Sequence, residues 1–146
     1  MQELLTIKLH DYLAAHHPDL LLSLEEEGKV NVYLEEKVQG INDEMESLLA
    51  GDTPAYMVEI HCMDILIDSM GASKYDYIYN LLEDEFEESF TKLERQGILL
   101  FEVINIIQHC SDLLNGFDED DKFLRYTVIA AIDEYFAHPS TVGHGV

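Results

Sequence analysis

Basic residues are scarce in this chain, and their scarcity limits the partners it can have. Lys and Arg together number eight, against 30 Asp and Glu, so the 146 residues carry a formal net charge of −22 at pH 7. Proteins that bind free nucleic acid neutralise its phosphates with Lys and Arg. We therefore expect no direct nucleic-acid ligand, and a basic protein or a second copy of the chain as the partner.

Cysteines and long apolar runs are scarce as well. The two cysteines, Cys62 and Cys110, form no CxxC pair, which argues against a zinc ribbon or a redox motif and indicates a reducing compartment. No apolar run approaches the ~18 residues of a membrane span. The opening stretch MQELLTIKLHDYL contains charges and lacks a small-residue cleavage site, unlike a signal peptide. The sequence predicts a cytoplasmic protein with no membrane contact.

The familiar signatures of catalytic and metal sites are also missing. The sequence has no Gly-rich phosphate loop, no GxSxG and no HExxH. The acidic stretch FDEDDKF suggests a calcium loop, but Phe123 and Ile129 stand where an EF-hand needs Gly and Glu. We predict a protein that is not an enzyme and holds no cofactor and no metal.

Helical periodicity, in contrast, runs along the whole chain, and no strand-like alternation is seen. Gly71 is predicted to end one helix and Ser73 to cap the next, and Thr53 is predicted to cap a helix that begins at Pro54. The predicted helices are Leu5–Leu13, Leu20–Glu27, Lys29–Leu49 (where Gly40 favours a kink), Pro54–Met70, Ser73–Leu93, Ile98–Leu114 and Leu124–Tyr135.

These helices predict an all-α fold, a single compact bundle of five to seven helices over residues 1–137, followed by a flexible tail at 138–146. Ile98–Leu114 has the widest apolar face and is predicted to be the central buried helix. Its two apolar rows are Leu100, Val103, Ile107, Cys110 and Leu114, and Leu99, Ile106 and Leu113. The apolar stripe predicted for Pro54–Met70 is Tyr56, Ile60, Met63, Ile67 and Met70.

An acidic stretch, YNLLEDEFEESFTKLE, is the first candidate site. If it forms one helix, Leu82 and Phe86 share the buried face, and the carboxylates occupy the opposite side and its flanks. One interpretation is an ordinary solvated surface. The other is a docking face for a basic partner, made by Glu83, Asp84, Glu87 and Glu88.

Two weaker polar clusters lie on other predicted helices. His61, Asp64 and Asp68 are spaced i, i+3, i+7, so they could hold a divalent metal; alternatively, His61 is a boundary residue that accepts a hydrogen bond or pairs with Asp64.

The second cluster is a narrow polar stripe on the most apolar helix, made by Glu102, Asn105, His109 and Asp112. It could contain a His109–Asp112 catalytic dyad, or it could be the side of the helix that reaches solvent.

Three stretches carry a resemblance to a known family: LTIKLHDYLAAHHPDL, ILIDSMGASKYDYIYNLLEDEF and FDEDDKFLRYTVIAAIDEYF. They resemble a family of small, mostly helical bacterial proteins of unknown function, often encoded on conjugative transposons. The resemblance spans Leu5–Phe136, with Asn31–Asp52 departing most from the pattern. It implies an all-helical domain in a bacterial cytoplasm and carries no catalytic or binding residues to transfer.

Three functional hypotheses follow. The first is a non-enzymatic module that binds a protein partner through its acidic helical surface. The second is an acidic decoy that imitates DNA phosphates and occupies a DNA-binding protein. The third is a metal-dependent enzyme that uses His61, Asp64 and Asp68, or His109.

Overall fold

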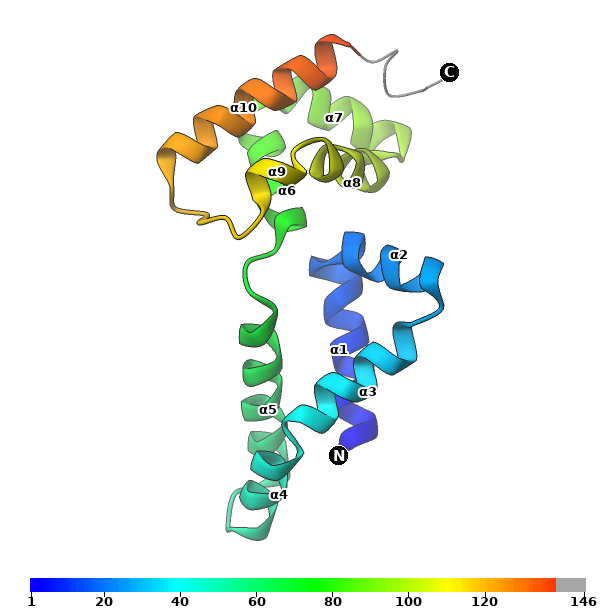
Figure 1. Ribbon diagram of the computed structural model, residues 1–146, viewed down its shortest axis with the longest axis vertical. Helices are drawn as coiled ribbons and strands as arrows, with labels where there is room; N and C mark the ends of the chain where they lie inside the picture. Colours follow the sequence, from blue (N-terminus) through cyan, green and yellow to red (C-terminus); the bar gives the residue numbers. More distant parts are fainter. Residues whose placement is uncertain (139–146) are drawn as a thin grey trace. The chain divides into compact units, whose positions relative to one another are not determined.

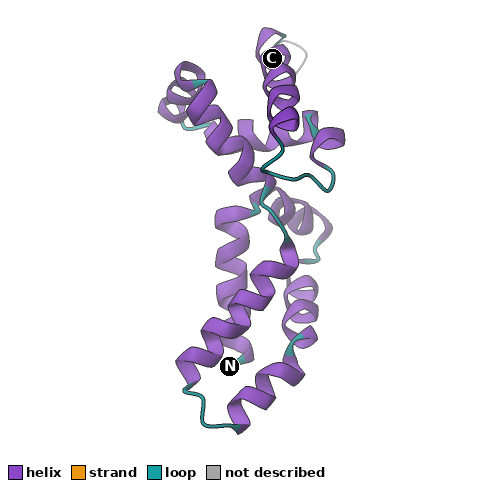
Figure 2. Ribbon diagram, turned by 90° about the vertical axis from the view of Figure 1, so that its left-hand side faces the viewer, coloured by secondary structure: helices purple, strands orange, loops and turns teal. Residues whose placement is uncertain are grey.

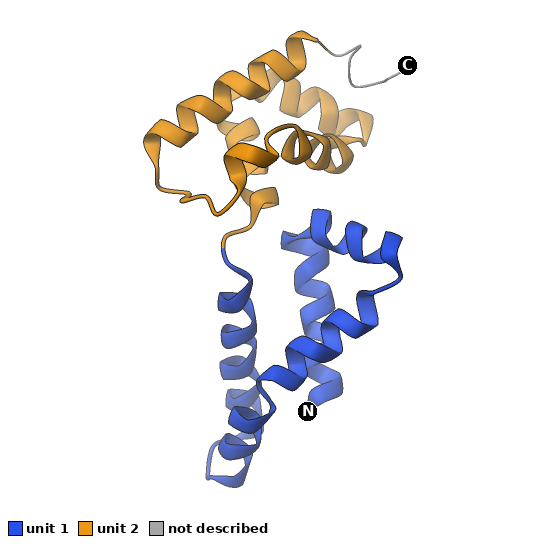
Figure 3. Cartoon of the chain, in the orientation of Figure 1, with its two compact units in different colours: residues 1–71 blue, residues 72–146 orange. Residues whose placement is uncertain are grey.

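The computed structural model describes residues 1–138, which contain ten helices and no strand (Figure 2). The predicted all-α class is confirmed. The chain divides into two compact units, Met1–Gly71 (unit 1) and Ala72–Val146 (unit 2), and each is described by itself (Figure 3). Of the predicted tail, residues 139–146 lie outside the described part of the chain.

Unit 1 is built around its first helix. Its helices are α1 (Gln2–His16), α2 (Pro18–Glu27), α3 (Val30–Gly40), α4 (Asn42–Ala50) and α5 (Ala55–Met70). Helix α1 contacts α2, α3 and α5, and Figure 1 shows α3 crossing it. Leu5, Leu9 and Leu13 are fully buried, as their helical spacing predicts. The other buried side chains of this core are Leu21, Leu34, Val38, Met45, Val58, Cys62 and Leu66.

Unit 2 is built around the segment that the sequence predicted to be central. Its helices are α6 (Lys74–Glu85), α7 (Glu87–Gln96), α8 (Leu99–His109), α9 (Ser111–Leu114) and α10 (Lys122–Ala137). Helix α8 contacts α6, α7, α9 and α10. The buried side chains of its core are Ile78, Leu81, Leu82, Phe90, Leu99, Val103, Ile106, Ile107, Cys110, Leu114, Val128, Ile132 and Tyr135. Ile98–Leu114 is therefore the centre of unit 2, while unit 1 has a core of its own.

The predicted count of five to seven helices is wrong, because three predicted helices are each broken once. The breaks fall at Ile41, Phe86 and Cys110, whose ψ angles of 12°, 48° and 17° leave the helical range. Each break ends one helix and begins the next one or two residues later. The kink favoured at Gly40 lies one residue from the break at Ile41.

The backbone hydrogen bonds explain why Ile41, Phe86 and Cys110, which are neither glycine nor proline, can occupy these breaks. At the second break the Phe86 N–H donates to Leu82 at 2.9 Å, and the Phe86 carbonyl accepts from Phe90 at 2.8 Å. Ile41 and Cys110 likewise accept a bond from the helix that follows them. Because the breaks keep their hydrogen bonds and negative φ angles, ordinary residues can form them.

Helix ends with their own local signals were easier to predict. Ser73 caps α6 as predicted, since its side chain accepts a hydrogen bond from the Asp76 N–H at 2.9 Å. Gly71 ends α5 as predicted, with φ 73° and ψ −169°, a conformation that residues with a side chain rarely adopt. Thr53 is not a cap, because α5 begins at Ala55 with Pro54 as its flanking residue.

The register of two helices differs from the predicted stripes. In α5 the buried row is Val58, Cys62 and Leu66, whereas Tyr56 and Ile60 from the predicted stripe are 66% and 56% exposed. In α8, Leu100 is exposed although its neighbours in the predicted row are buried. Both helices are apolar on more than one side, so spacing alone could not determine which side packs inward.

Among the described residues, no helix is long and apolar enough to cross a membrane. The single domain predicted over residues 1–137 stays a prediction, because a division into compact units does not measure whether they fold together.

Candidate functional site

The acidic stretch lies at the break between α6 and α7 and not on one helix face. Glu83 and Asp84 belong to the last turn of α6, and Glu87 and Glu88 open α7. Phe86 stands between the helices with φ −133° and ψ 48°. The predicted arrangement of one buried and one solvated face along a continuous helix is therefore wrong, and the carboxylates surround a bend.

The bend gives these carboxylates unequal electrostatic surroundings. Glu87 and Glu88 lie in the first turn of α7, where the helix dipole favours negative charge, whereas Glu83 and Asp84 lie at the unfavourable end of α6. Arg125 of α10 compensates the α6 end: its Nη2 lies 3.0 Å from Glu85 Oε2 and 3.8 Å from Asp84 Oδ2. Sequence reasoning missed Arg125, because only the fold brings α10 to this bend.

The other carboxylates of the bend are open to solvent. Glu83, Glu87 and Glu88 are exposed and make no ion pair or side-chain hydrogen bond within residues 1–138. They are therefore available to an external partner. That Glu83, Asp84, Glu87 and Glu88 dock a basic partner stays a prediction.

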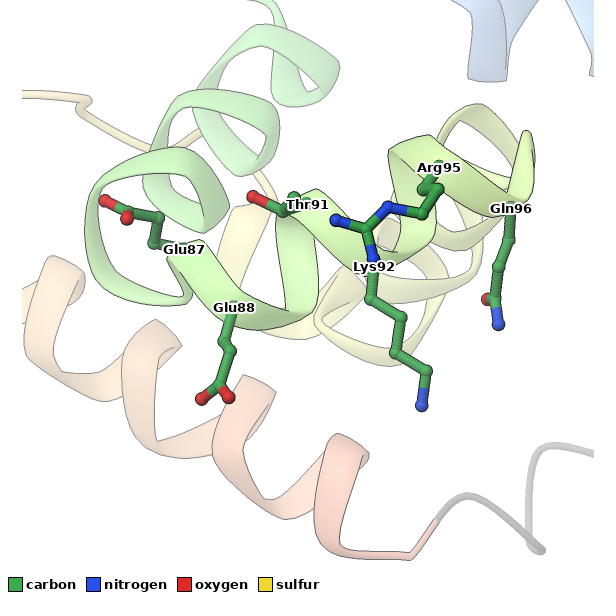
Figure 4. A pocket seen from close by; sticks show the side chains of 6 residues that line it. All are labelled: Glu87, Glu88, Thr91, Lys92, Arg95 and Gln96. Atoms are coloured by element: carbon green, nitrogen blue, oxygen red, sulfur yellow. The ribbon is translucent and has the colours of Figure 1, made fainter.

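A depression runs along α7 beside this bend (Figure 4). Its lining residues are Glu87, Glu88, Thr91, Lys92, Arg95 and Gln96. All six are exposed and all come from one helix, so the feature is an open surface. Sites for small-molecule substrates are concave and enclose most of the ligand. The depression is better suited to a macromolecular contact than to a substrate.

His61 finds a partner other than the predicted one. Its Nε2 lies 3.0 Å from Glu44 Oε1 of α4, and both side chains are about half exposed. The predicted pairing with Asp64 is therefore replaced by a link between α4 and α5. No group of three or more His, Cys, Asp or Glu with metal-binding geometry occurs among the described residues, so the structure does not assemble His61, Asp64 and Asp68 into a ligand set.

Glu102 makes the best-defined polar contact of α8. The hydroxyl of Tyr135 donates a hydrogen bond to Glu102 Oε1 at 2.7 Å, which ties α10 to α8. Burial raises the pKa of Tyr135, and the bond to Glu102 raises it further, while a hydrogen bond with Asn105 acts in the opposite direction. Such a phenol keeps its proton at neutral pH and serves as a tether. The sequence analysis gave Tyr135 only as the last residue of the predicted helix Leu124–Tyr135, so its polar role was missed.

His109 and Asp112 are not joined as a dyad. His109 is the last residue of α8 and Asp112 lies in α9, beyond the break at Cys110. The ring of His109 packs edge-on against that of Tyr135, with centroids 5.4 Å apart. No hydrogen bond joins His109 to Asp112 in the described part of the chain. The imidazole is exposed, so the stripe here is the solvent-reaching side of the helix.

The two thiols are core residues. Cys62 and Cys110 are 0% and 1% exposed, in the cores of units 1 and 2 respectively. Burial raises the pKa of both, that of Cys110 to about 11, so neither thiol ionises readily at neutral pH. Neither is therefore an activated nucleophile.

The fold is all-helical, and several of its polar side chains link helices or face solvent. The chain belongs to the family described as a domain of unknown function, DUF1896, whose model matches residues 4–132. Neither a curated protein nor a solved structure matches the chain.

Proposed function

We propose that this protein is a non-enzymatic interaction module whose acidic helical surface binds a basic partner protein. The observation that carries the proposal is the surplus of carboxylates with no counter-charge. The sequence has 30 carboxylates against eight Lys and Arg. Lys8 pairs with Glu59, and Arg125 pairs with Asp84 and Glu85, so the few cations present are partly used already.

The carboxylates that no Lys or Arg neutralises are the reason to expect a basic partner. Unpaired like charges destabilise a compact state through their mutual repulsion. A basic partner relieves that repulsion when it binds, and the opposite charges steer its approach. The open carboxylates Glu83, Glu87 and Glu88 at the α6–α7 bend are the first candidates for this steering surface.

The setting of this interaction follows from the resemblance stated above. We place the module in the cytoplasm of a bacterium whose mobile elements carry related genes. The lack of an activated nucleophile at Cys62 or Cys110 supports a binding role over a catalytic one.

The test is affinity capture from bacterial lysate with three purified proteins, followed by quantitative mass spectrometry at low and moderate salt. The first is the parent, and the second carries Glu83→Gln, Glu87→Gln and Glu88→Gln. We expect the parent to enrich one or a few basic proteins in a salt-sensitive manner, and the triple variant to recover less of the same proteins.

The matched control carries Glu25→Gln, Glu26→Gln and Glu27→Gln. It removes the same charge from exposed positions at the end of α2 in unit 1. Equal losses in both triple variants would show that net charge acts without a defined surface. Capture of only neutral or acidic proteins by the parent would contradict the proposed function.

A further inference from the structure

Charge brings a partner to a surface, but stable interfaces are held by buried aromatic and apolar anchors. Within residues 1–138, exposed apolar side chains that lie among carboxylates are the candidates for such anchors. Phe123 and Tyr126 of α10 are 80% and 70% exposed, which makes them the two most exposed of the large hydrophobic side chains there. Two aromatic rings in water at adjacent turns of one helix are available as anchors.

Helix α10 has two clearly different faces. Val128, Ile132 and Tyr135 are buried in the core of unit 2. On the opposite side an arc of about 120°, counted at about 100° per residue, contains Phe123 and Tyr126. The exposed residues of this arc, called the outer face of α10 below, are Phe123, Tyr126, Ala130, Asp133, Glu134 and Ala137.

Charged residues stand at both ends of the apolar strip. Asp133 and Glu134 of the outer face follow it, and the exposed Glu119 and Asp120 precede it in the loop before α10, with the exposed Lys122 between them and Phe123. The strip from Phe123 to Glu134 is about 16 Å long at about 1.5 Å per residue. An apolar centre between two acidic ends is therefore presented over three helical turns.

Two neighbouring carboxylates have local structural roles and are left out of the outer face. Asp121 caps α10 by accepting a hydrogen bond from the Leu124 N–H at 3.1 Å. Asp118 accepts one from the Asp120 N–H at 2.9 Å. Glu119 and Asp120 have no side-chain partner within residues 1–138, so their carboxylates are open to a ligand.

We propose that the outer face of α10 docks a cationic amphipathic helix of a partner protein, with apolar side chains over Phe123 and Tyr126 and Lys or Arg at both ends. The apolar strip matches the apolar stripe of such a helix. The acidic ends match its cations, and Arg or Lys also stacks on aromatic faces. This inference rests on the proposed function and names the surface and the class of partner.

Charge complementarity decides against a second copy of this chain as the occupant. The outer face carries two carboxylates and no cation, the exposed Lys122 lies just beside its first residue, and each copy has a net charge of −22. Any pairing of two outer faces would bring like charges together, which is costly at an interface.

The experiment measures binding of two fluorescein-labelled synthetic peptides by anisotropy at 50 mM and 300 mM NaCl. The first peptide is an 18-residue amphipathic helix with Leu in its centre and Arg and Lys at both ends. The second is a scrambled version with identical charge and no apolar face. We expect the parent to bind the first peptide more tightly, and Phe123→Ala with Tyr126→Ala to weaken that binding at least about tenfold.

The matched control carries Tyr56→Ala and Ile60→Ala on α5, which are also exposed apolar residues and also leave the charge unchanged. It should bind as the parent does. Equal affinity of the parent and the α10 variant, or equal losses in the two variants, would overturn the outer face as the docking site and leave the proposed function standing. If the parent binds neither peptide, the proposed function itself fails.

Two further measurements complete the test. Sedimentation equilibrium of the parent should show a monomer; a dimer that the α10 variant abolishes would assign the outer face to a second copy. The melting temperature of the α10 variant should equal that of the parent, because both side chains are exposed. A lowered melting temperature would mean that the rings pack within the chain and would overturn the proposal.

Discussion

The two units carry equal numbers of carboxylates but bury different kinds of side chain. All six phenylalanines and five of the eight tyrosines lie in unit 2, whereas unit 1 has only Tyr12, Tyr33 and Tyr56. The core of unit 1 is made of Leu, Val, Met and Cys, and that of unit 2 is bordered by aromatic rings. Aromatic residues bring polar groups to the core boundary, and these need partners.

The ring contacts show what the aromatic residues do for unit 2. Tyr79 of α6 meets Phe90 of α7 edge-on at 5.2 Å, and Phe86 at the bend meets Phe136 of α10 at 5.7 Å. The rings therefore connect helices on both sides of the α6–α7 break. In unit 1, where the core is aliphatic, the leucines of α1 have the corresponding central role.

The largest expected effect is on the aliphatic core. Leu9→Ala should lower the free energy of unfolding by about 2–5 kcal/mol, because Leu9 is fully buried in the centre of unit 1 and the change leaves a cavity. Chemical denaturation followed by far-UV circular dichroism measures it. Leu4→Ala, at a 40% exposed position of the same helix, is the control and should have a much smaller effect. Equal losses would mean that the core of unit 1 is placed wrongly.

The same denaturation experiments, followed also by near-UV circular dichroism, can decide whether the two units unfold together. The near-UV signal arises mostly from unit 2, because most aromatic residues lie there. If Leu9→Ala lowers the near-UV and far-UV midpoints together, the single cooperative domain predicted from the sequence is supported. A far-UV shift alone would contradict it.

The second effect concerns the core of unit 2. Ile107→Ala should cost about 1–4 kcal/mol, the range for truncating a buried aliphatic side chain, since Ile107 is 5% exposed. Leu100→Ala on the same helix is the matched control, because Leu100 is 42% exposed despite its place in the predicted apolar row. A large loss from Leu100→Ala and none from Ile107→Ala would reverse the assigned face of α8.

The third effect uses the tyrosines that distinguish unit 2. Tyr135→Phe removes the hydrogen bond to Glu102 and should cost about 0.5–1.5 kcal/mol at neutral pH. The pKa of Tyr135 is higher in the folded state than in the unfolded state, where it is near 10. The stabilisation that Tyr135 provides is therefore complete at pH values below the unfolded-state pKa, and it is lost as the pH rises through the folded-state pKa.

Denaturation at several pH values between about 8 and 12, bracketing that tyrosine pKa, tests this effect. The parent should lose stability above about pH 10, and Tyr135→Phe should lose less over the same range. Tyr126→Phe, at an exposed position, should follow the parent. If the alkaline slopes of the parent and Tyr135→Phe are the same, Tyr135 does not control the loss.

The fourth effect is that of salt, which should stabilise both units. At physiological ionic strength, salt screening limits the range of the repulsion between charges to about 8 Å. The melting temperature should therefore rise by roughly 3 °C between low and moderate NaCl. This shift is equivalent to about 1 kcal/mol in the free energy of unfolding. Unit 1 has fifteen carboxylates against three lysines, and unit 2 fifteen against five basic residues. If the two units unfold separately, the rise should be larger in the far-UV than in the near-UV signal; if they unfold together, it should be the same in both signals. A flat melting temperature would show that the repulsion is already relieved.

The smallest effect separates a bend from a continuous helix. On one helix, Glu83 and Glu87 would repel each other and both neutralisations would stabilise the protein. At the bend, Glu83→Gln should stabilise and Glu87→Gln should destabilise, each by a few tenths of a kcal/mol (~0.3), since they lie at opposite helix ends. The double variant should then be as stable as the parent. If both single variants were more stable than the parent, the result would contradict the bend and support a continuous helix.

Sequence patterns were sufficient wherever the structure is determined locally. The helical spacing of Leu5, Leu9 and Leu13 predicted the buried face of α1, and Ser73 caps α6 as its position indicates. The prediction favoured a kink at Gly40, next to the break at Ile41, but missed the break at Phe86, where the backbone hydrogen bonds are kept and no unusual residue marks the position. Such breaks are favoured by the packing of the two helices against other helices. The apolar periodicity of a sequence gives no information about these packing partners.

The candidate site shows the same limit. The sequence located the acidic side chains but not their partners, because those come from distant elements. Arg125 lies 40 residues from Glu85, and Tyr135 lies 33 residues from Glu102. Charge and spacing along one segment therefore predicted which groups exist at the surface, while the fold decided which of them are paired.

Gly71 shows how a purely geometric requirement can resemble a functional one. A Cβ atom built at this exposed position meets nothing within 4 Å, yet φ 73° with ψ −169° strains any residue other than glycine. In a deep mutational scan, position 71 would tolerate glycine alone, with no ligand, no buried neighbour and no charge to account for it. In an alignment of the family, an unchanging glycine at this position would look like an active-site residue, although selection there would be acting on the conformation of the backbone.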